Sequence, residues 1–489
     1  MINSISLENF KCFKEKVTLP ISNLTLLSGL NSCGKSSLYQ ALLLLQQSEY
    51  CILEYGDNLI PYLKLNGSIV QLGKPEEIIN DLSKHTIFVS LNFDDRSKIE
   101  NTYILDDNIS LKKNLKYNIK PTLLLKKSVL KFGEGKYEFL RNDNSNNIKA
   151  SSALYFEDSI FEEHLFNYIQ EKCIENNIEI RREFYLSSIV EFENITSVFF
   201  YQNIIRSFLV NISDATNCLA ENYRELFKAE EFNSYLKKKD YKKKVFELKL
   251  NEFTKAIRTF NFEKNIIFIP PFRGYPKRIY IETEDPNPMS YLDEHLNDII
   301  KYEIVNNEVK ENTLSAALNY WIPKILNIDQ EFKINSIVNG LVSETVFIIN
   351  NREIAINNVG FGISQILPMI VKVLASAEGS FCIVDEPEVH LHPAVQSKIA
   401  DFFYTMSKLN KKILIETHSE YIINKINYFK MIDKSKEINL YWIIKNEGES
   451  EIVKIETDTL GYIINPPQGF LDENNIITEL LSEERCKRI

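Results

Sequence analysis

The sequence predicts an α/β fold in which buried strands lead into short polar loops. Three stretches support this prediction. Residues 24–45 read as a leucine-rich strand, a glycine-containing loop and an apolar helix. Residues 380–386 and 412–416 are apolar runs of strand length, and each ends in acidic side chains. Near-continuous apolar runs of this kind are typical of strands that are buried on both faces.

The loop after the first strand has the sequence of a phosphate-binding loop. Residues 29–36, GLNSCGKS, fit the pattern G-x-x-x-x-G-K-[ST], with a strand before it and a helix after it, as this pattern requires. Backbone N–H groups at a helix start offset polyphosphate charge, and glycines permit the turn. Lys35 would reach the β- and γ-phosphates, and the Ser36 hydroxyl would be a ligand of Mg²⁺. The expected nucleotide-binding residues are Gly29, Asn31, Ser32, Cys33, Gly34, Lys35, Ser36 and Ser37.

The two later strands supply the candidate catalytic groups. Residues 380–388, SFCIVDEPE, place an apolar strand directly before two carboxylates. Asp385 would hold Mg²⁺ through water, and Glu386 would orient or deprotonate the attacking water. The strand 412–416 leads into His418, which can hydrogen-bond the γ-phosphate or that water. Adjacent acids are often only solvated and a strand-end histidine is often structural, but their combination with the phosphate loop favours catalysis.

A second helix start lies between the two halves of the site, at residues 358–368, NVGFGISQILP. Gly360, Gly362, Ser364 and Gln365 offer N–H groups and a hydroxyl to an anion. Because the chain already has its own cradle, this site would serve the nucleotide of another protomer in a head-to-tail dimer. The alternative is a glycine turn before a buried helix.

Two further residues are weaker candidates. Gln71 follows a predicted hairpin over residues 63–70 and would touch both Mg²⁺ and the attacking water, although an ordinary exposed strand end is favoured. Arg273 belongs to residues 270–278, a proline-punctuated loop with three cations. That loop would face the nucleotide or a partner, or it is purely structural.

Composition restricts the compartment and the partners. The chain has 489 residues and a net charge of -10, which argues against a uniformly basic nucleic-acid coat. Its 7 cysteines form no C-x-x-C pair, which suits a reducing cytosol. Met1 runs directly into a predicted strand, and the longest apolar run, residues 363–377, is broken by Lys372. We therefore expect no secretion signal, no membrane insertion and a cytoplasmic location.

Taken together, the segments GLNSCGKS, VGFGISQ, VDEPEVHLHP and ETHSEYIINKI resemble the AAA-family ATPases with an ABC-type head. This group includes the OLD-family ATPases, the repair ATPase RecF and the structural-maintenance-of-chromosomes proteins. Residues 10–13, FKCF, resemble the same group. The resemblance implies ATP hydrolysis with Mg²⁺ and a homodimer or higher homo-oligomer. By residue, it implies that the helix start described above is the signature that contacts ATP in trans, that Pro387, Glu388 and His390 belong to the D-loop, and that His418 is the switch histidine.

The resemblance covers residues 1–90 and 264–489. The loop at residues 270–273, PPFR, and the tail segments 458–461, DTLG, and 466–473, PPQGFLDE, resemble a bacterial subfamily with a C-terminal domain of unknown function, often encoded in anti-phage defence loci. Two departures qualify it. The signature reads GFGISQ instead of LSGGQ, and about seventy residues follow His418, which is too few for the Toprim nuclease domain of OLD-type proteins. We therefore expect no nuclease in this chain.

The predicted fold is an ABC-type P-loop ATPase head with a mixed β lobe, an α/β lobe and an inserted, mainly helical unit. Residues 1–95 would form the N-terminal lobe, 96–263 the insertion, 264–438 the C-terminal lobe and 439–489 a small extension. Helical spacing over residues 156–174 supports the insertion. It also holds the basic run 237–244, for which a solvated helix face is favoured over a phosphate-binding surface. The sequence contains no sustained apolar heptads, so we expect no long coiled-coil arms.

These observations support an ATP-dependent switch that controls an effector protein, such as a nuclease or toxin, or that senses double-stranded DNA. A DNA-repair-type ATPase or a weakly hydrolysing scaffold is the alternative. A transporter ATPase subunit is the least supported class, because the long insertion and the EPEVHLHP element do not suit it.

Overall fold

The computed structural model describes residues 1–48, 51–55, 58–94, 96–106, 122–132, 135–144, 147–156, 266–273, 279–281, 297–327, 331–338, 342–349, 351–358, 361–433, 437–446, 449–458, 463–464, 466–467 and 470. The chain divides into two compact units. Residues 1–19 and 40–263 form unit 1, and residues 20–39 and 264–489 form unit 2. Helix α1 (Lys35–Gln47) contributes residues to both units.

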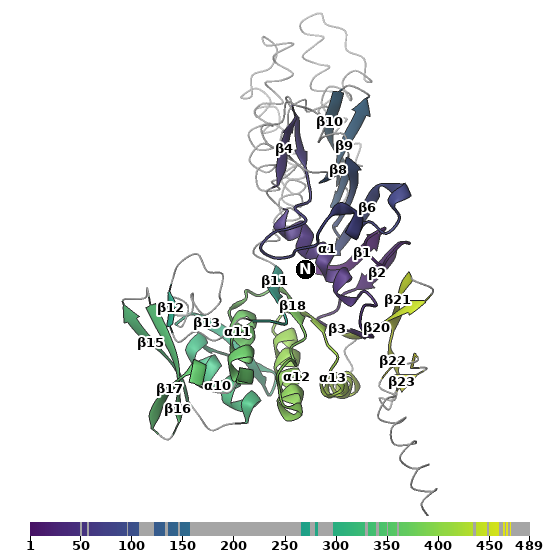
Figure 1. Ribbon diagram of the computed structural model, residues 1–489. Helices are drawn as coiled ribbons and strands as arrows, with labels where there is room; N and C mark the ends of the chain where they lie inside the picture. Colours follow the sequence, from purple (N-terminus) through teal and green to yellow (C-terminus); the bar gives the residue numbers. More distant parts are fainter. Residues whose placement is uncertain are drawn as a thin grey trace, which may run out of the picture. The chain divides into compact units, whose positions relative to one another are not determined.

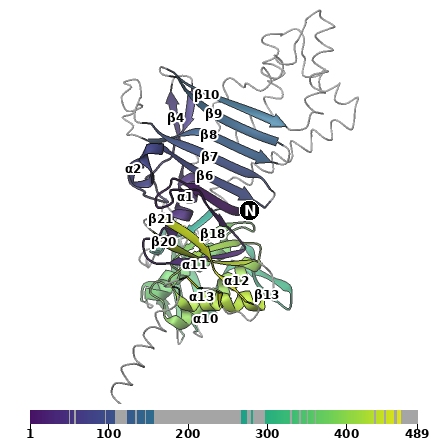
Figure 2. The same cartoon turned by 90° about the vertical axis from the view of Figure 1, so that its right-hand side faces the viewer.

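Unit 1 contains a seven-stranded sheet with the order β10-β9-β8-β7-β6-β1-β2. From β1 to β10 each neighbouring pair is antiparallel, and Figure 2 shows β6 to β10 side by side. The interior strand β6 alternates buried apolar residues with its other side chains, as a period of two requires. The strands are β1 (Ile2–Glu8), β2 (Val17–Pro20), β6 (Thr86–Phe93), β7 (Lys98–Asp106), β8 (Thr122–Phe132), β9 (Gly135–Asn144) and β10 (Asn147–Phe156).

Short elements complete the described part of unit 1. These are the hairpin strands β4 (Ile52–Tyr55) and β5 (Asn58–Pro61), helix α2 (Pro75–Ile78) and the 3-10 turn η1 (Leu82–Lys84). The hairpin expected over residues 63–70 is reduced to a tight turn, in which Gly67 N donates to Val70 O at 2.9 Å. A single bridge joins Asn66 to Gln71.

The expectation of a mainly helical segment from residue 96 onward is wrong for its described part. Residues 98–156 form four strands in the described ranges, β7 to β10. The misleading feature is a buried polar pair on neighbouring strands: Ser128 Oγ donates to Asn101 Oδ1 at 2.6 Å. Because this pair replaces apolar side chains on a buried face, the period of two is hard to recognise in the sequence. The predicted helix over 156–174, except Phe156, and the basic run 237–244 lie outside the described residues.

Unit 2 is organised around a six-stranded sheet with the order β11-β18-β19-β3-β20-β21. The first five strands are parallel, and β21 is antiparallel to β20. Strand β3, which precedes the phosphate loop, therefore lies between β19 and β20. The strands are β3 (Leu24–Gly29), β11 (Ile266–Ile269), β18 (Phe381–Asp385), β19 (Lys412–Glu416), β20 (Ile438–Asn446) and β21 (Glu449–Lys454).

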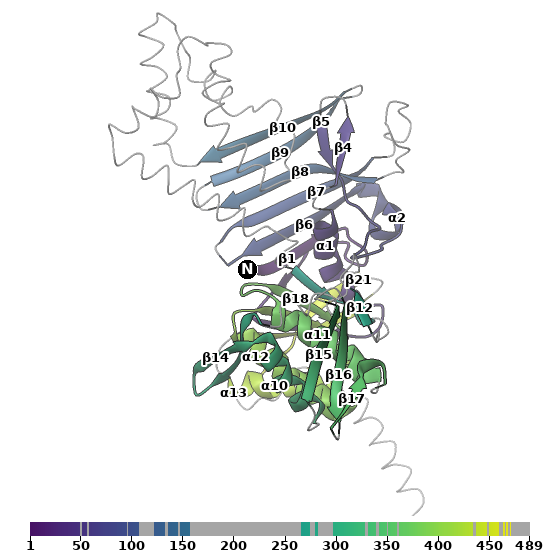
Figure 3. The ribbon, with the colours of Figure 1, turned by 90° about the vertical axis from the view of Figure 1, so that its left-hand side faces the viewer.

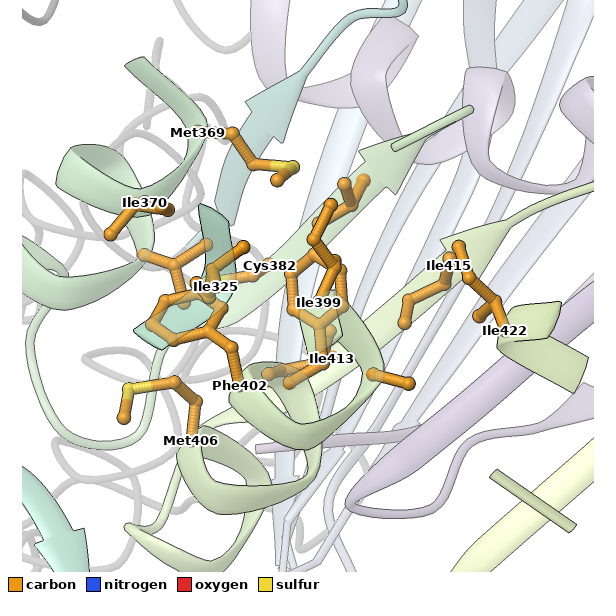
Figure 4. Close-up of a cluster of buried hydrophobic side chains, with 14 of the residues drawn as sticks. Ile325, Met369, Ile370, Cys382, Ile399, Phe402, Met406, Ile413, Ile415 and Ile422 are labelled. Atoms are coloured by element: carbon orange, nitrogen blue, oxygen red, sulfur yellow. The ribbon is translucent and has the colours of Figure 1, made fainter. Parts of the chain in front are cut away.

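One face of this sheet packs on a cluster of helices, as Figure 1 shows. They are α10 (Leu314–Leu326), α11 (Phe361–Ala375), α12 (Pro393–Lys408) and α13 (Glu420–Ile432). Alternate strand residues, such as Ile413 and Ile415 of β19, join Phe402 of α12 and Ile422 of α13 in one buried cluster (Figure 4). Leu414, on the opposite face, is 0% exposed. The sheet is thus buried on both faces, which explains the apolar runs in the sequence.

The remaining elements of unit 2 lie outside the six-stranded sheet. A second sheet has the order β12-β16-β15, with β17 paired to β16 (Figure 3). Strands β13 and β14 form a hairpin, and β22 pairs with β23. The bounds are β12 (Ile279–Ile281), β13 (Ile299–Val305), β14 (Glu308–Thr313), β15 (Glu331–Val338), β16 (Val342–Ile349), β17 (Arg352–Ala355), η3 (Ile356–Asn358), β22 (Glu456–Thr457) and β23 (Ile463–Ile464).

Two features differ from the expected domain limits. Residues 20–39, which include the phosphate loop, cluster with unit 2 and not with the rest of the N-terminal lobe. Strands β20 and β21, expected in a small extension from residue 439, belong to the main sheet because β20 pairs with β3. The sequence shows where strands occur but not which strands pair. Among the described residues, no helix is both long and apolar enough to cross a membrane.

Candidate nucleotide-binding site

The phosphate loop connects the end of β3 to the start of α1, as the sequence predicts. Gly29 has a φ of 146°, and a Cβ atom there would lie 2.4 Å from Ile443 O of β20, so only glycine fits. Asn31 and Ser32 are exposed, whereas Cys33 is buried. Gly34 has a φ of 99°. This loop therefore leads directly into a helix N-terminus, the arrangement that binds phosphate.

Lys35 is the first residue of α1 and is only 4% exposed. Its ammonium donates to Gly29 O at 3.2 Å and to Leu30 O at 2.8 Å. A third group, Glu416 Oε1, lies 3.9 Å from Lys35 Nζ. A buried ammonium needs such partners. The lysine is thus held within the loop where a phosphate would meet its charge.

Two acidic strand ends lie beside the loop. Asp385 ends β18 and Glu416 ends β19, and the two residues are register partners in the parallel sheet. Asp385 Oδ2 accepts a hydrogen bond from Tyr39 OH at 2.7 Å. Glu416 Oε2 accepts one from Ser36 Oγ at 2.9 Å. The first turns of α1 are therefore joined to both acids.

Burial of these two carboxylates is electrostatically costly, and the charges of Lys35 and Arg273 offset only part of this cost. The pKa of Asp385 is raised to about 7, mainly by burial and also by the charges of Glu416 and Glu386, while the Tyr39 hydrogen bond and the charge of Arg273 act in the opposite direction. Burial also raises the pKa of Glu416, while the neighbouring hydroxyls of Tyr39 and Ser36 and the charge of Lys35 lower it. Crowded acids of this kind are a feature of functional sites. Their oxygens, with the Ser36 hydroxyl, form the donor set that Mg²⁺ prefers, so these residues fit that ion.

His418 lies close to Glu386, the residue that follows Asp385. Its Nε2 is 3.8 Å from Glu386 Oε1, and its backbone N donates to Glu388 Oε1 at 2.6 Å. Burial and the charge of Lys35 lower the pKa of His418, against the opposing charge of Glu386, and this favours the neutral imidazole. Glu386 has a φ of 42°, an uncommon conformation for a non-glycine residue, and such strain concentrates at functional sites.

Arg273 is packed behind the acidic strand end. Its Nη2 donates to Asp385 O at 3.1 Å and to Glu386 O at 3.2 Å. Burial lowers the pKa of Arg273 to about 10, so the guanidinium remains charged at neutral pH. Its backbone N donates to Gln365 Oε1 at 3.1 Å. Arg273 thus supports the backbone that carries both acids.

The candidate signature occupies the start of α11. Gly362 lies so close to the D-loop that a Cβ atom there would be 2.7 Å from His390 O. Gln365 is 1% exposed, so its side chain is engaged within its own protomer. Ser364 lies in the first turn of α11, and Gly360 lies outside the described residues. His390 has a φ of 65°.

Sequence reasoning missed two residues of the site. Tyr39 and Glu416 were not predicted, although Glu416 ends an apolar strand just before His418 and Tyr39 lies one helical turn after Lys35. Ser37, in the same turn, is buried. Gln71 is exposed and belongs to unit 1.

A phosphate loop between a strand and a helix, with acids at the ends of two neighbouring parallel strands, defines a P-loop nucleoside triphosphatase fold with an ABC-type head. The chain matches the family model described as "AAA ATPase domain" over residues 1–423 and belongs to this family. It is therefore a nucleotide-binding ATPase, as the sequence motifs predict. None of the curated proteins matches the chain.

Several solved structures resemble the chain. The SMC head domain from Thermotoga maritima is 10% identical, with a TM-score of 0.36, and the match covers 93% of this chain and 99% of that chain. The Smc head domain with an extended coiled coil bound to the C-terminal domain of ScpA, from Pyrococcus furiosus, is 13% identical, with a TM-score of 0.35 and 99% coverage of both chains. The Smc head domain with a coiled coil and joint from Pyrococcus yayanosii is 11% identical, with a TM-score of 0.37 and coverage of 93% and 97%.

Proposed function

We propose that this ATPase is a molecular switch in which ATP and Mg²⁺ bind at the end of β3 and hydrolysis resets the protein. The observation that carries the proposal is the meeting of the phosphate loop with the acidic ends of β18 and β19. Ser36 and Asp385 would hold Mg²⁺, which neutralises phosphate charge. Lys35 would bind the β- and γ-phosphates.

Glu386 and His418 are the proposed catalytic residues. Glu386 is about one-third exposed, so its carboxylate can reach a water molecule, which it would orient and from which it would accept the proton. His418, neutral and 3.8 Å from that carboxylate, would hold the water or the γ-phosphate by a hydrogen bond. Arg273 would keep the strand end in place through the backbone carbonyls of Asp385 and Glu386.

A second protomer would complete the site. The N-terminus of α11, with Gly362 and Ser364, would contact the nucleotide of the partner in a head-to-tail homodimer. The close approach of Gly362 to His390 supports this, because it joins the signature helix to the D-loop in one rigid contact. ATP binding would then close the dimer, and hydrolysis would open it.

The biological role that we propose is the ATPase component of a cytoplasmic bacterial anti-phage defence system. In this role the dimer would control an effector such as a nuclease or toxin, or would sense double-stranded DNA. The support is the sequence resemblance described above. The second candidate is a weakly hydrolysing scaffold or DNA-repair ATPase, for which turnover would be unaffected by Glu386→Gln.

Four proteins test this proposal together: the unmodified protein, Lys35→Ala, Glu386→Gln and Ser364→Arg. We expect Lys35→Ala to lose ATP binding, because it removes the buried ammonium. Glu386→Gln should bind ATP, hydrolyse it at least about 100-fold more slowly and accumulate as a dimer, as expected for loss of a general base. Ser364→Arg should bind ATP in its own loop but form no dimer. Binding is measured by calorimetry and dimerisation by light scattering. Equal ATP affinity in the unmodified protein and Lys35→Ala would refute the assignment.

A further inference from the structure

The hydroxyl of Ser36 has an acceptor that the motif pattern does not include. Ser36 Oγ donates to Glu416 Oε2 at 2.9 Å. The other acid, Asp385 at the end of β18, accepts a hydrogen bond at Oδ2 from Tyr39 OH at 2.7 Å. A serine hydroxyl has one proton and two lone pairs. With its proton directed at Glu416, the Ser36 hydroxyl turns its lone pairs away from that carboxylate, where they can accept a cation.

The six-stranded sheet holds the backbone of Glu416 in place, and its side chain is buried. Glu416 is the last residue of β19, the strand between β18 and β3, and is 4% exposed. Its backbone O accepts from Glu386 N at 2.9 Å. The ammonium of Lys35 lies beside it, with Nζ 3.9 Å from Glu416 Oε1. Burial of a carboxylate is costly unless such partners offset it.

We propose that Glu416 is the positioning residue of the magnesium site, so that the nucleotide-binding site contains a third carboxylate besides the metal ligand Asp385 and the proposed base Glu386. Glu416 orients Ser36 and places a fixed negative charge beside the phosphate position. This inference rests on the proposed function of the site. Its consequence is that nucleotide binding depends on the cation: without Mg²⁺, Glu416 repels the polyphosphate, and with Mg²⁺ this repulsion is cancelled.

The quantity that tests this inference is the Mg²⁺ coupling, the ratio of the ATP dissociation constants without and with Mg²⁺. Glu416→Gln keeps an acceptor for Ser36 but removes the charge, so ATP should bind at least about tenfold more tightly in EDTA. Binding in MgCl2 should weaken, and the coupling should fall by about tenfold or more. Glu416→Asp keeps the charge on a side chain one methylene shorter, so it should lose coupling without gaining affinity in EDTA.

The experiment measures binding of a fluorescent ATP analogue to the full chain in EDTA and in MgCl2, with unfolding midpoints recorded for every variant. Glu449→Gln is the matched control, because Glu449 is an exposed carboxylate on β21. Ser36→Ala and the double variant complete a cycle. Because Glu416 acts through Ser36, the two substitutions should be non-additive in their effect on coupling.

The outcomes separate the two proposals. Coupling in Glu416→Gln and Glu416→Asp equal to that of the unmodified protein, or strict additivity with Ser36→Ala, would overturn the role of Glu416. If Glu416→Gln does not fold, Glu416→Asp and the Ser36→Ala cycle built on it decide the question. Failure of the unmodified protein to bind the analogue in either buffer would instead refute the proposed function.

Discussion

Replacing Tyr39 by phenylalanine removes a single oxygen atom from the centre of the site. Tyr39 is 1% exposed, and its hydroxyl donates to Asp385 Oδ2 at 2.7 Å. The ring and its packing remain, so the substitution isolates one hydrogen bond. Such a bond contributes about 1.5–3 kcal/mol when its partner is charged and about 0.5–1.5 kcal/mol when both groups are neutral.

The pKa of Asp385, raised by burial to about 7, makes this loss depend on pH. Between about pH 4 and pH 7 the folded protein retains a proton that the unfolded chain has released, so this group lowers the free energy of unfolding as pH rises. Tyr39→Phe should raise the pKa of Asp385 in the folded protein further, so that the free energy of unfolding continues to fall above pH 7. We therefore expect a destabilisation of about 2–3 kcal/mol at pH 8.5 and about 1 kcal/mol at pH 5.5.

Urea unfolding followed by tryptophan fluorescence measures this difference, because Trp321 and Trp442 are the only tryptophans and both lie in unit 2. Two matched variants serve as controls. Tyr404→Phe removes a partly exposed hydrogen bond, in which Tyr404 OH donates to Asp433 Oδ2 at 3.0 Å, and it should lower the free energy of unfolding by less than Tyr39→Phe does. Tyr441→Phe removes a buried hydroxyl that has no partner within the described residues, and should be neutral or stabilising. An equal loss for Tyr39→Phe at both pH values, or a loss no larger than that of Tyr441→Phe, would refute the reasoning.

Two further predictions concern α11. Lys411 is buried and donates to two carbonyls at the C-terminal end of this helix, and burial lowers its pKa to about 8. Between about pH 8 and 10.5 the unfolded chain keeps a proton on Lys411 that the folded protein has released. This residue therefore raises the free energy of unfolding by up to about 3 kcal/mol as pH rises through that range. Lys411→Met should flatten this rise when the free energy of unfolding is measured by urea titration at each pH. Gly362→Ala should destabilise unit 2 by about 1–3 kcal/mol, because its Cβ would meet His390 O at 2.7 Å. Gly362→Ala should also prevent the ATP-dependent dimer, and unchanged light scattering and stability would contradict this contact.

The sequence was sufficient to predict the local elements of the site. The strand before the phosphate loop, the helix that begins at Lys35 and the two strands that end at Asp385 and Glu416 are all present. Each is a short apolar run bounded by residues that strongly favour a turn or a helix start, so local information is enough. The catalytic and metal-binding roles of these residues remain predictions.

The sheet of unit 1 was not predictable in the same way. Its strands β7 and β8 place Asn101 and Ser128 on a buried face, where they hydrogen-bond to each other. In the sequence these two residues look like solvent-exposed positions, and they break the alternation that identifies a strand. Only the pairing of the two strands shows that each polar side chain satisfies the other.

Glu416 shows the same limitation in the site itself. Ser36 and Glu416 are separated by 380 positions and Tyr39 and Asp385 by 346, so no motif can specify either pair. The strand order β18-β19-β3 and the register of Asp385 with Glu416 decide which acid each hydroxyl of α1 reaches. A serine and an acid at a strand end identify the chemistry of a cation site, but the choice of acceptor determines where the lone pairs of that serine point. In this protein Tyr39 donates to Asp385 and Ser36 donates to Glu416. Substitutions at Tyr39 and Glu416 should therefore have separable effects. The first should change how the free energy of unfolding depends on pH, and the second should change the Mg²⁺ dependence of nucleotide binding.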